Sequence, residues 1–282
     1  MKKYFIISSI LALIMLIVGS IGLLATGEAF RGISFGNYGV KFNGVAEYFT
    51  QEIDVASSNI KFNLNVPNTK VEIYSGTNNR IIVNCWYNNE NDKFTIDSNE
   101  DTINIKRKES YGTINLFDFS SIAGTVEIIV PESIIGNYTV EATNGNIDIN
   151  DIKASNIDIE TTNGNFEIGD ITVEGEVKIN TNNGRVVAED INAESISFET
   201  TNGLVDIEDI KSNDIRVRTT NGLIKAYNCY SKDIILRTTN GAITLENEDK
   251  NYQIENLDVN TTNGKETVNA NYKKMCIRDR YS

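Results

Sequence analysis

A chain of 282 residues is long enough to bury a substantial apolar core in one large domain or two modest ones. Its formal net charge of -13 makes nucleic acid an unsuitable partner, because phosphates repel an acidic surface. Histidine is absent, which excludes nucleophilic sites of the Cys-His and Ser-His types.

The chain begins with a segment typical of a membrane anchor. Residues 4–26 carry no charge and are mainly Ile, Leu, Val, Phe, Ala and Met. As a helix, this segment would extend roughly 35 Å, enough to cross a hydrocarbon core of about 30 Å. Lys2 and Lys3 precede it, so the positive-inside rule predicts a cytoplasmic N-terminus. We therefore predict a single-pass cell-membrane anchor over residues 1–27 and an extracytoplasmic C-terminal domain.

A cleaved secretory signal is the alternative to an anchor. Such signals have a shorter apolar region, of roughly 7 to 15 residues, although Ala25, Thr26 and Gly27 could form a small-residue cleavage site. Either segment would export the rest of the chain. No cysteine lies near its end, so a lipoprotein anchor is not supported.

Two less regular regions follow the anchor. Residues 28–59 contain scattered glycines and aromatic residues without a sustained period, which indicates a stalk or linker. From Ile60 to Val66 every second residue is apolar, and short runs of this kind recur at irregular spacing as far as residue 137. This pattern predicts an irregular β region over residues 60–137.

The most regular part of the chain is residues 138–271, where Asn-Gly recurs at spacings of 19, 20, 19, 19, 19 and 23 residues. A period of this length marks a stacked repeat. Counted from the glycine, positions seven and five before it and two and four after it are apolar throughout the first six repeats. Each repeat therefore holds two strands with one buried face.

Two strands per repeat of about 19 residues predict an all-β fold, a parallel β-solenoid in which each coil lies on the one before. A single coil should not fold alone, because its few apolar side chains do not offset the backbone entropy lost on ordering. Stacking pairs the backbone groups of neighbouring coils and covers both ends of each coil's core. An antiparallel meander of hairpins is the alternative, since Asn-Gly also favours hairpin turns.

The asparagine before each repeat glycine is predicted to join a structural ladder of stacked amides at a corner, where Asn and Gly tolerate positive φ. The ladder residues are Asn144, Asn163, Asn183, Asn202, Asn221, Asn240 and Asn263.

A threonine column lies three residues before the glycines and shares the inward parity of the apolar positions. Its hydroxyls are predicted to bond the backbone at the corner. An ice-binding face is the alternative, but the neighbouring threonines are adjacent rather than alternating on one flat face. The column is Thr161, Thr181, Thr200, Thr219, Thr238 and Thr261.

An acidic column lies six residues after the glycines. A calcium ladder would need several oxygens converging on each ion, so turn capping is the favoured interpretation, and we expect no metal or other cofactor. The column is Asp151, Asp170, Asp190 and Asp209, continued by Asn228 and Asn247.

A charged column four residues before the glycines changes from acidic to basic along the chain: Glu141, Glu160, Asn180, Glu199, Arg218, Arg237 and Asn260. It predicts a solvated face. The more specific hypothesis is a surface that binds a polymer or a partner protein. The candidate binding residues are Glu199, Arg216, Arg218 and Arg237.

Two further features concern the cysteines and the C-terminus. Cys229 takes the place of a core isoleucine in its repeat, and a bridge to Cys85 is not favoured because the two lie in different parts of the fold. Residues 274–280 resemble the translation of a transposase adapter used in sequencing libraries. We expect residues 272–282 to be a truncated end with adapter-derived residues, a genuine basic tail being the alternative.

The run from Val126 to Pro131, together with residues 138–149 and the Thr-Thr-Asn-Gly coils after them, resembles the bacterial putative-adhesin family of β-strand repeat domains of unknown function. The resemblance covers about residues 60–271, and the N-terminal segment is similar to that of membrane-anchored Gram-positive members. It implies a β-strand repeat fold and an adhesin-like role, and it supplies no catalytic residues.

These observations predict a non-enzymatic protein of the cell surface, since its acids are spread by the repeat rather than clustered as in a sugar-cleaving site. The expected partners are the membrane and a cell-wall polymer or another envelope protein. Similarity to members linked with cell-envelope stress makes an accessory or sensor role the alternative. A solenoid carbohydrate-active enzyme is a more distant third.

Overall fold

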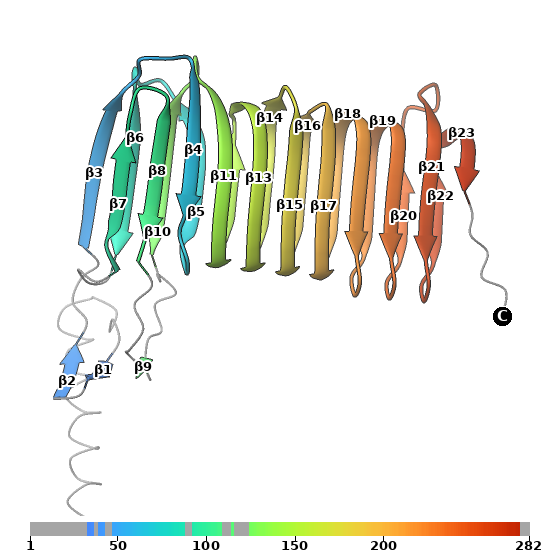
Figure 1. Ribbon diagram of the computed structural model, residues 1–282. Helices are drawn as coiled ribbons and strands as arrows, with labels where there is room; N and C mark the ends of the chain where they lie inside the picture. Colours follow the sequence, from blue (N-terminus) through green and yellow to red (C-terminus); the bar gives the residue numbers. More distant parts are fainter. Residues whose placement is uncertain are drawn as a thin grey trace, which may run out of the picture. The chain divides into compact units, whose positions relative to one another are not determined.

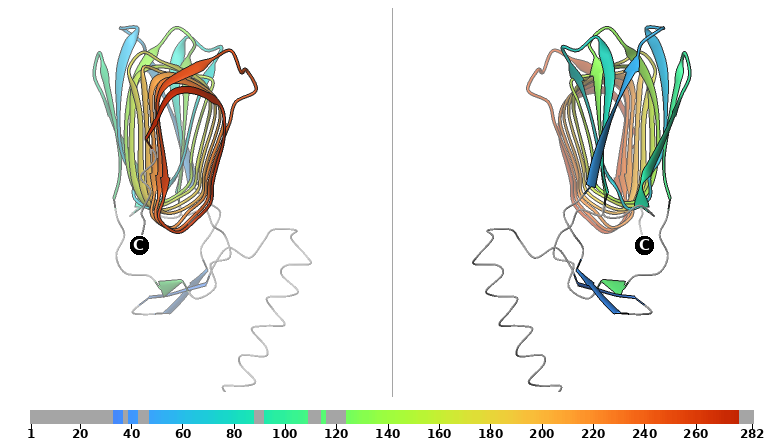
Figure 2. Two further views of the ribbon diagram at one scale, coloured as in Figure 1. Left: turned by 90° about the vertical axis from the view of Figure 1, so that its right-hand side faces the viewer. Right: turned by 90° about the vertical axis from the view of Figure 1, so that its left-hand side faces the viewer.

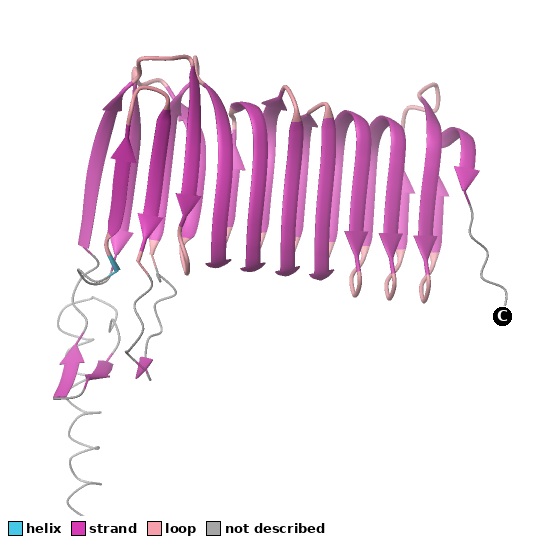
Figure 3. Cartoon of the chain, in the orientation of Figure 1, coloured by secondary structure: helices cyan, strands magenta, loops and turns pink. Residues whose placement is uncertain are grey.

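The computed structural model describes residues 33–36, 39–42, 47–87, 92–108, 114–115 and 124–276, and this part of the chain consists almost wholly of strands and turns (Figure 3). It divides into two units, Met1–Val45 with Ser110–Ser121, and Ala46–Glu109 with Ile122–Ser282. The predicted anchor at residues 4–26 lies outside the described residues. Within them, no helix is long and apolar enough to span a membrane.

The described part of the first unit is a small antiparallel sheet. Its central strand β1 (Ile33–Gly36) pairs with β2 (Gly39–Phe42) on one side and with β9 (Ile114–Asn115) on the other. Both β1 and β2 fall within the range that the sequence assigns to a stalk.

The second unit is a flattened parallel β-solenoid whose coils lie one on another along a single axis (Figures 1 and 2). Equivalent positions of successive coils pair in register, as Ile157 with Val177 and Ile196 with Ile215 do. This parallel pairing confirms the solenoid of two-strand coils and excludes the antiparallel meander for the repeats. Two sheets face each other across the core.

The first sheet contains the strands that precede the Asn-Gly corners, together with β4, β7, β8 and β23. They are β4 (Asn59–Asn65), β7 (Phe94–Ser98), β8 (Thr102–Arg107), β11 (Ile135–Asn144), β13 (Lys153–Asn163), β15 (Glu176–Asn183), β17 (Ser195–Asn202), β21 (Gln253–Thr261), β23 (Asn271–Cys276) and the ends of β18 (Val205–Thr219) and β19 (Ile224–Thr238).

The second sheet contains the strands that follow those corners, and β3 and β6 at its edge. They are β3 (Glu47–Asp54), β5 (Lys70–Gly76), β6 (Arg80–Tyr87), β10 (Thr125–Pro131), β12 (Ile147–Asn150), β14 (Phe166–Val173), β16 (Val186–Asn192), β20 (Ile243–Glu246), β22 (Glu266–Asn269) and the beginnings of β18 and β19. The four apolar columns of the repeat fill the space between the sheets, where Ile207 and Phe198 are wholly buried.

The region that the sequence describes as irregular also contributes coils to the solenoid. Strands β4 and β5 form a coil that pairs in parallel with β11 and β12 on one side and with β8 and β10 on the other. Antiparallel strands complete this end, since β6 pairs with β10, β3 with β6, and β7 with β8. The coil order in space therefore differs from the chain order, which explains why no period is visible there.

The cysteines of the described residues are all free thiols. Cys229 is fully buried in the column where other coils have isoleucine, and Cys85 is fully buried in β6. Burial raises the pKa of both thiols, that of Cys85 to about 12, so neither is a reactive thiolate at neutral pH.

The last described strand, β23, pairs with β21 and includes three residues of the adapter-like run, with Lys274 opposite Asn256. A parallel edge accepts backbone groups whatever the side chains are. The pairing therefore does not bear on the origin of these residues, which stays a prediction.

Candidate functional site

The Asn-Gly corners carry a continuous ladder of side-chain amides. In every coil the Nδ2 group donates to the Oδ1 atom of the preceding asparagine, at 2.6 to 2.8 Å. The ladder includes all seven asparagines of the repeat and begins one coil earlier, at Asn68.

The glycines of these corners are required by close approach, and not by the positive φ that the Asn-Gly pairs predict. A Cβ atom on Gly222 would lie 1.8 Å from the carbonyl oxygen of Gly203, and the other repeat glycines stack in the same way. At this corner, the described residues with left-handed φ are Asn68 and Gly145 alone. Stacked backbones leave no room for a side chain.

The left-handed conformation occurs instead in the acidic column. Asp151, Asp170, Asp190, Asp209 and Asn228 all have φ between 49° and 53°, a region in which Asp and Asn are enriched. This turn accounts for the residue type. Among the described residues, no group of three or more His, Cys, Asp or Glu side chains could hold a metal ion.

Asn247, which continues the acidic column, has a different role. Its side chain is buried and makes two hydrogen bonds to the backbone of Cys229, accepting from the nitrogen at 2.9 Å and donating to the oxygen at 2.8 Å. It replaces the strand partner that Cys229 would otherwise need.

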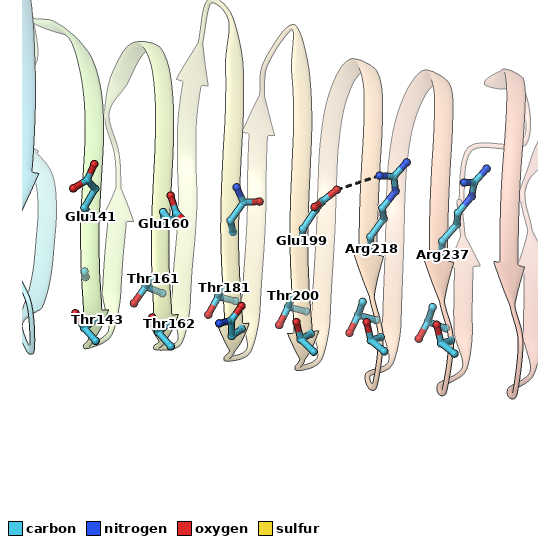
Figure 4. A pocket seen from close by; sticks show the side chains of 18 of the residues that line it. Glu141, Thr143, Glu160, Thr161, Thr162, Thr181, Glu199, Thr200, Arg218 and Arg237 are labelled. Carbon is cyan, nitrogen blue, oxygen red and sulfur yellow. Dashed lines mark hydrogen bonds and ion pairs between the residues drawn. The ribbon is translucent and has the colours of Figure 1, made fainter.

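The candidate binding site is a polar groove of about 900 Å³ that follows the first sheet beside the corners (Figure 4). It runs across the coils rather than within one of them. Its walls and floor are three neighbouring columns, namely the charged column, the threonine column and the polar residues directly before the asparagines.

The charged column gives the groove two unlike halves. Glu141, Glu160 and Glu199 line one half, and Arg218 and Arg237 line the other (Figure 4). Arg218 and Glu199 meet at the boundary, with 3.3 Å between Nη1 and Oε1. An extended ligand would therefore meet acidic groups first and basic groups afterwards.

Of the predicted binding residues, Glu199, Arg218 and Arg237 line the groove, whereas Arg216 lies on β18 outside it. Each of the three arginines is paired with a carboxylate. Arg216 pairs with Asp214 at 2.7 Å, and Arg237 is hydrogen-bonded to Asp258, which raises its pKa. A ligand anion must compete with these carboxylates.

The threonine column, in the floor of the groove, also differs between the halves. In the basic half, the hydroxyls of Thr219, Thr238 and Thr261 donate to the carbonyl oxygens of glycines in the preceding coil, at 3.4, 3.1 and 2.8 Å. This is the backbone bonding that the sequence predicts.

In the acidic half the threonine hydroxyls of the same column lack this hydrogen bond. Thr161, Thr181 and Thr200 are only 5, 6 and 7% exposed, and their hydroxyls have no hydrogen-bond partner among the described residues. All three line the groove. A buried hydroxyl without a partner costs about 1 to 3 kcal/mol, so the acidic half holds three polar atoms that the corner backbone leaves unsatisfied beneath the groove. The sequence gives no sign of this difference, because the threonine column is uniform.

The groove therefore offers a hydrogen-bonding group from each coil, repeated every 4.8 Å or so along the solenoid axis. Its acids stand one per coil instead of facing each other as an acid and base pair. This arrangement is suited to holding an extended, polar molecule by many equivalent contacts.

Solved structures of two other proteins are similar to this chain. A solved structure from Bacteroides fragilis, described as a putative adhesin, is 13% identical over 82% of this chain and 97% of its own, with a TM-score of 0.51. One from Clostridium sporogenes, described as a putative cell adhesion protein, is 12% identical over 72% of this chain and 100% of its own, with a TM-score of 0.47. Likeness at this identity concerns the fold alone.

The search among curated proteins finds no match. The sequence profile of the Toastrack DUF4097 family, in contrast, matches residues 58–276, which include every coil of the solenoid. This match confirms the family resemblance drawn from the repeats. The chain belongs to the Toastrack DUF4097 family.

Proposed function

We propose that this protein is a non-enzymatic, adhesin-like module of the cell surface that holds an extended polymer in the groove of its first sheet. The observation that carries the proposal is the continuous polar groove across the coils, lined by Glu141, Glu160 and Glu199 in one half and by Arg218 and Arg237 in the other. The adhesin descriptions of proteins with a similar fold support it at the level of a surface role.

The chemistry of the groove favours a hydroxyl-rich polymer such as a cell-wall glycan. Sugar hydroxyls both donate and accept, so they can bond the carboxylates of the acidic half and the hydroxyls of exposed threonines such as Thr162 and Thr201 alike. Anionic groups on the same polymer would pair with Arg218 and Arg237 in the other half. The two halves together would fix the direction in which the polymer lies.

Replacing Thr143, Thr162 and Thr201 together by valine should weaken binding of purified cell-wall glycan at least several-fold, because these exposed hydroxyls line the groove. The melting temperature should change little, because substitutions of exposed side chains have small effects on stability. Titration calorimetry and thermal unfolding measure the two effects.

The matched control for this variant is Thr219, Thr238 and Thr261 replaced by valine, which removes hydroxyls already bonded to backbone carbonyls. This control should lose stability and keep most of its glycan affinity. Equal glycan affinity in the first variant and the parent would refute binding in the groove.

Replacing Arg216, Arg218 and Arg237 together by serine should leave folding nearly intact, because exposed ion pairs contribute little to stability. It should weaken attachment to an anionic wall polymer, and more strongly at low salt, where screening is least. The matched control is Arg185→Ser, which removes a paired, half-exposed arginine from the turn between β15 and β16. The hypothesis fails if the triple variant and the control bind alike at low ionic strength.

The location of the protein is part of the proposal. The apolar residues 4–26 would anchor it in the cell membrane with the solenoid outside. External protease on intact cells should then remove the solenoid, and full-length protein in the cytosolic fraction would overturn the proposed location.

A further inference from the structure

We propose that the asparagines of the last four corners, Asn202, Asn221, Asn240 and Asn263, are sites of spontaneous deamidation, whereas the fold protects the same residue in the first three corners. The inference is independent of the proposed ligand. It rests on a change in the backbone of the corners along the solenoid.

The chemistry needs only the Asn-Gly pair and water. The glycine nitrogen bonds to the asparagine Cγ, the Cγ–Nδ2 bond breaks, and the amide leaves as ammonia that carries the proton of the glycine nitrogen. Water then opens the cyclic imide at either carbonyl and gives aspartate or isoaspartate. Glycine favours the attack because it has no side chain to obstruct it.

In the first three corners the attacking nitrogen is held by the next coil. The N–H groups of Gly145 and Gly164 donate to the carbonyl oxygens of Asn163 and Asn183, both at 3.0 Å, and that of Gly184 donates to Asn202 at 3.3 Å. A nitrogen in such a bond is kept protonated and directed away from the side chain that it would attack.

From the fourth corner onward this bond is absent. Within the described chain, the N–H groups of Gly203, Gly222, Gly241 and Gly264 donate no hydrogen bond. The asparagine N–H groups of the last three corners donate to a threonine carbonyl of the preceding coil instead, at 2.8 Å. Figure 3 shows these three corners, after β18, β19 and β21, as loops that extend beyond the strand ends.

The amide ladder adds a second level of protection. The side chains of Asn202, Asn221 and Asn240 are held at both amide atoms, because each donates to the preceding asparagine and accepts from the next. Asn263 donates to Asn240, but its Oδ1 atom accepts no bond from the described residues. It should therefore react first.

The product would loosen the corner in which it forms. A carboxylate cannot donate to the Oδ1 atom of the preceding asparagine, and each event adds a negative charge to an already acidic chain. Isoaspartate also lengthens the backbone where the glycines stack in close contact. Ageing of the protein would thus begin at its last coils.

Peptide mass spectrometry of the native full-length protein, aged in mildly alkaline buffer, tests the proposal. The deamidation rates of the denatured chain serve as the reference, because the residue that follows each glycine also affects the rate. Relative to that reference, deamidation at the last four corners should be several-fold faster than at Asn144, Asn163 and Asn183, with Asn263 fastest. Equal relative rates at all seven corners would overturn the proposal.

The variant Asn240→Ala tests the ladder separately. It removes the donor to Asn221 and the acceptor of Asn263, so both should deamidate faster than in the parent, while Asn144 keeps its rate. Unchanged rates at both neighbours would overturn the protective role of the ladder.

Discussion

Ile207→Asp should lower the melting temperature of the protein sharply. Ile207 is wholly buried in β18, between Ala188 and Ala226 of the neighbouring coils. A carboxylate there has no partner in the apolar column, and burying it costs several kcal/mol, a large share of the stability of a typical domain. Thermal or denaturant unfolding of the purified protein measures the loss.

The loss should depend on pH in a defined direction. Burial raises the pKa of the new carboxyl group above its unfolded value, so the variant is destabilised most at neutral pH. The difference from the parent should shrink as the pH falls toward about 4, the pKa of an aspartate in an unfolded chain.

Ser197→Asp is the matched control for this variant. It places the same carboxylate on the outward face of β17, between Lys178 and Arg216, where water and two cations surround it. Its melting temperature should stay close to that of the parent. A similar fall in both variants would show that Ile207 does not lie in a closed core.

Gly222→Ala should lower the stability of the protein about as much as Ile207→Asp does, for a steric reason. The added Cβ would lie 1.8 Å from the carbonyl oxygen of Gly203, a backbone atom that cannot move without separating two coils. We expect the free energy of unfolding to fall by about 3 kcal/mol or more, since a backbone atom cannot move aside as a flexible side chain can. Denaturant unfolding of the variant and the parent gives the difference.

Gly169→Ala separates this steric effect from a general cost of replacing glycine. Its Cβ would lie 3.2 Å from Oδ1 of Asn150 and 3.4 Å from the carbonyl oxygen of Glu189, so a small shift of a flexible side chain accommodates it. Gly169 lies in β14, where alanine also costs less backbone entropy than glycine. Comparable losses in the two variants would contradict the stacking of the corner glycines.

The repeats could be predicted from sequence because every coil places apolar residues at the same inward positions. Inward residues such as Ile159 and Ile179 recur at one position, and parallel pairing then follows from their register. The position of β4 and β5 could not be predicted in this way. Their alternation identifies strands, but it does not say which other strands they pair with, and they lie between coils that are far from them in the sequence.

The groove was only partly predictable, for a similar reason. The change of sign between Glu199 and Arg218 is visible in the sequence, whereas the carboxylates that pair with Arg216 and Arg237 come from different columns. The unequal bonding of Thr200 and Thr219 depends on how the corner backbone turns, which residue types alone do not report.

The coil formed by β4 and β5 also determines how the solenoid should respond to a pulling force. At the far end, the last described strands, β22 and β23, are paired on one side only, so load applied there can peel them, then β21 and then β19 from the stack, at a low and repeated force. The β4 and β5 coil is paired on both sides with segments from elsewhere in the chain, so it cannot leave until two sets of strand pairs break together. Load applied from the N-terminal side reaches β3 first, which pairs with β6, so the β4 and β5 coil holds the stack after β3 has separated, while the far end yields gradually and absorbs the strain.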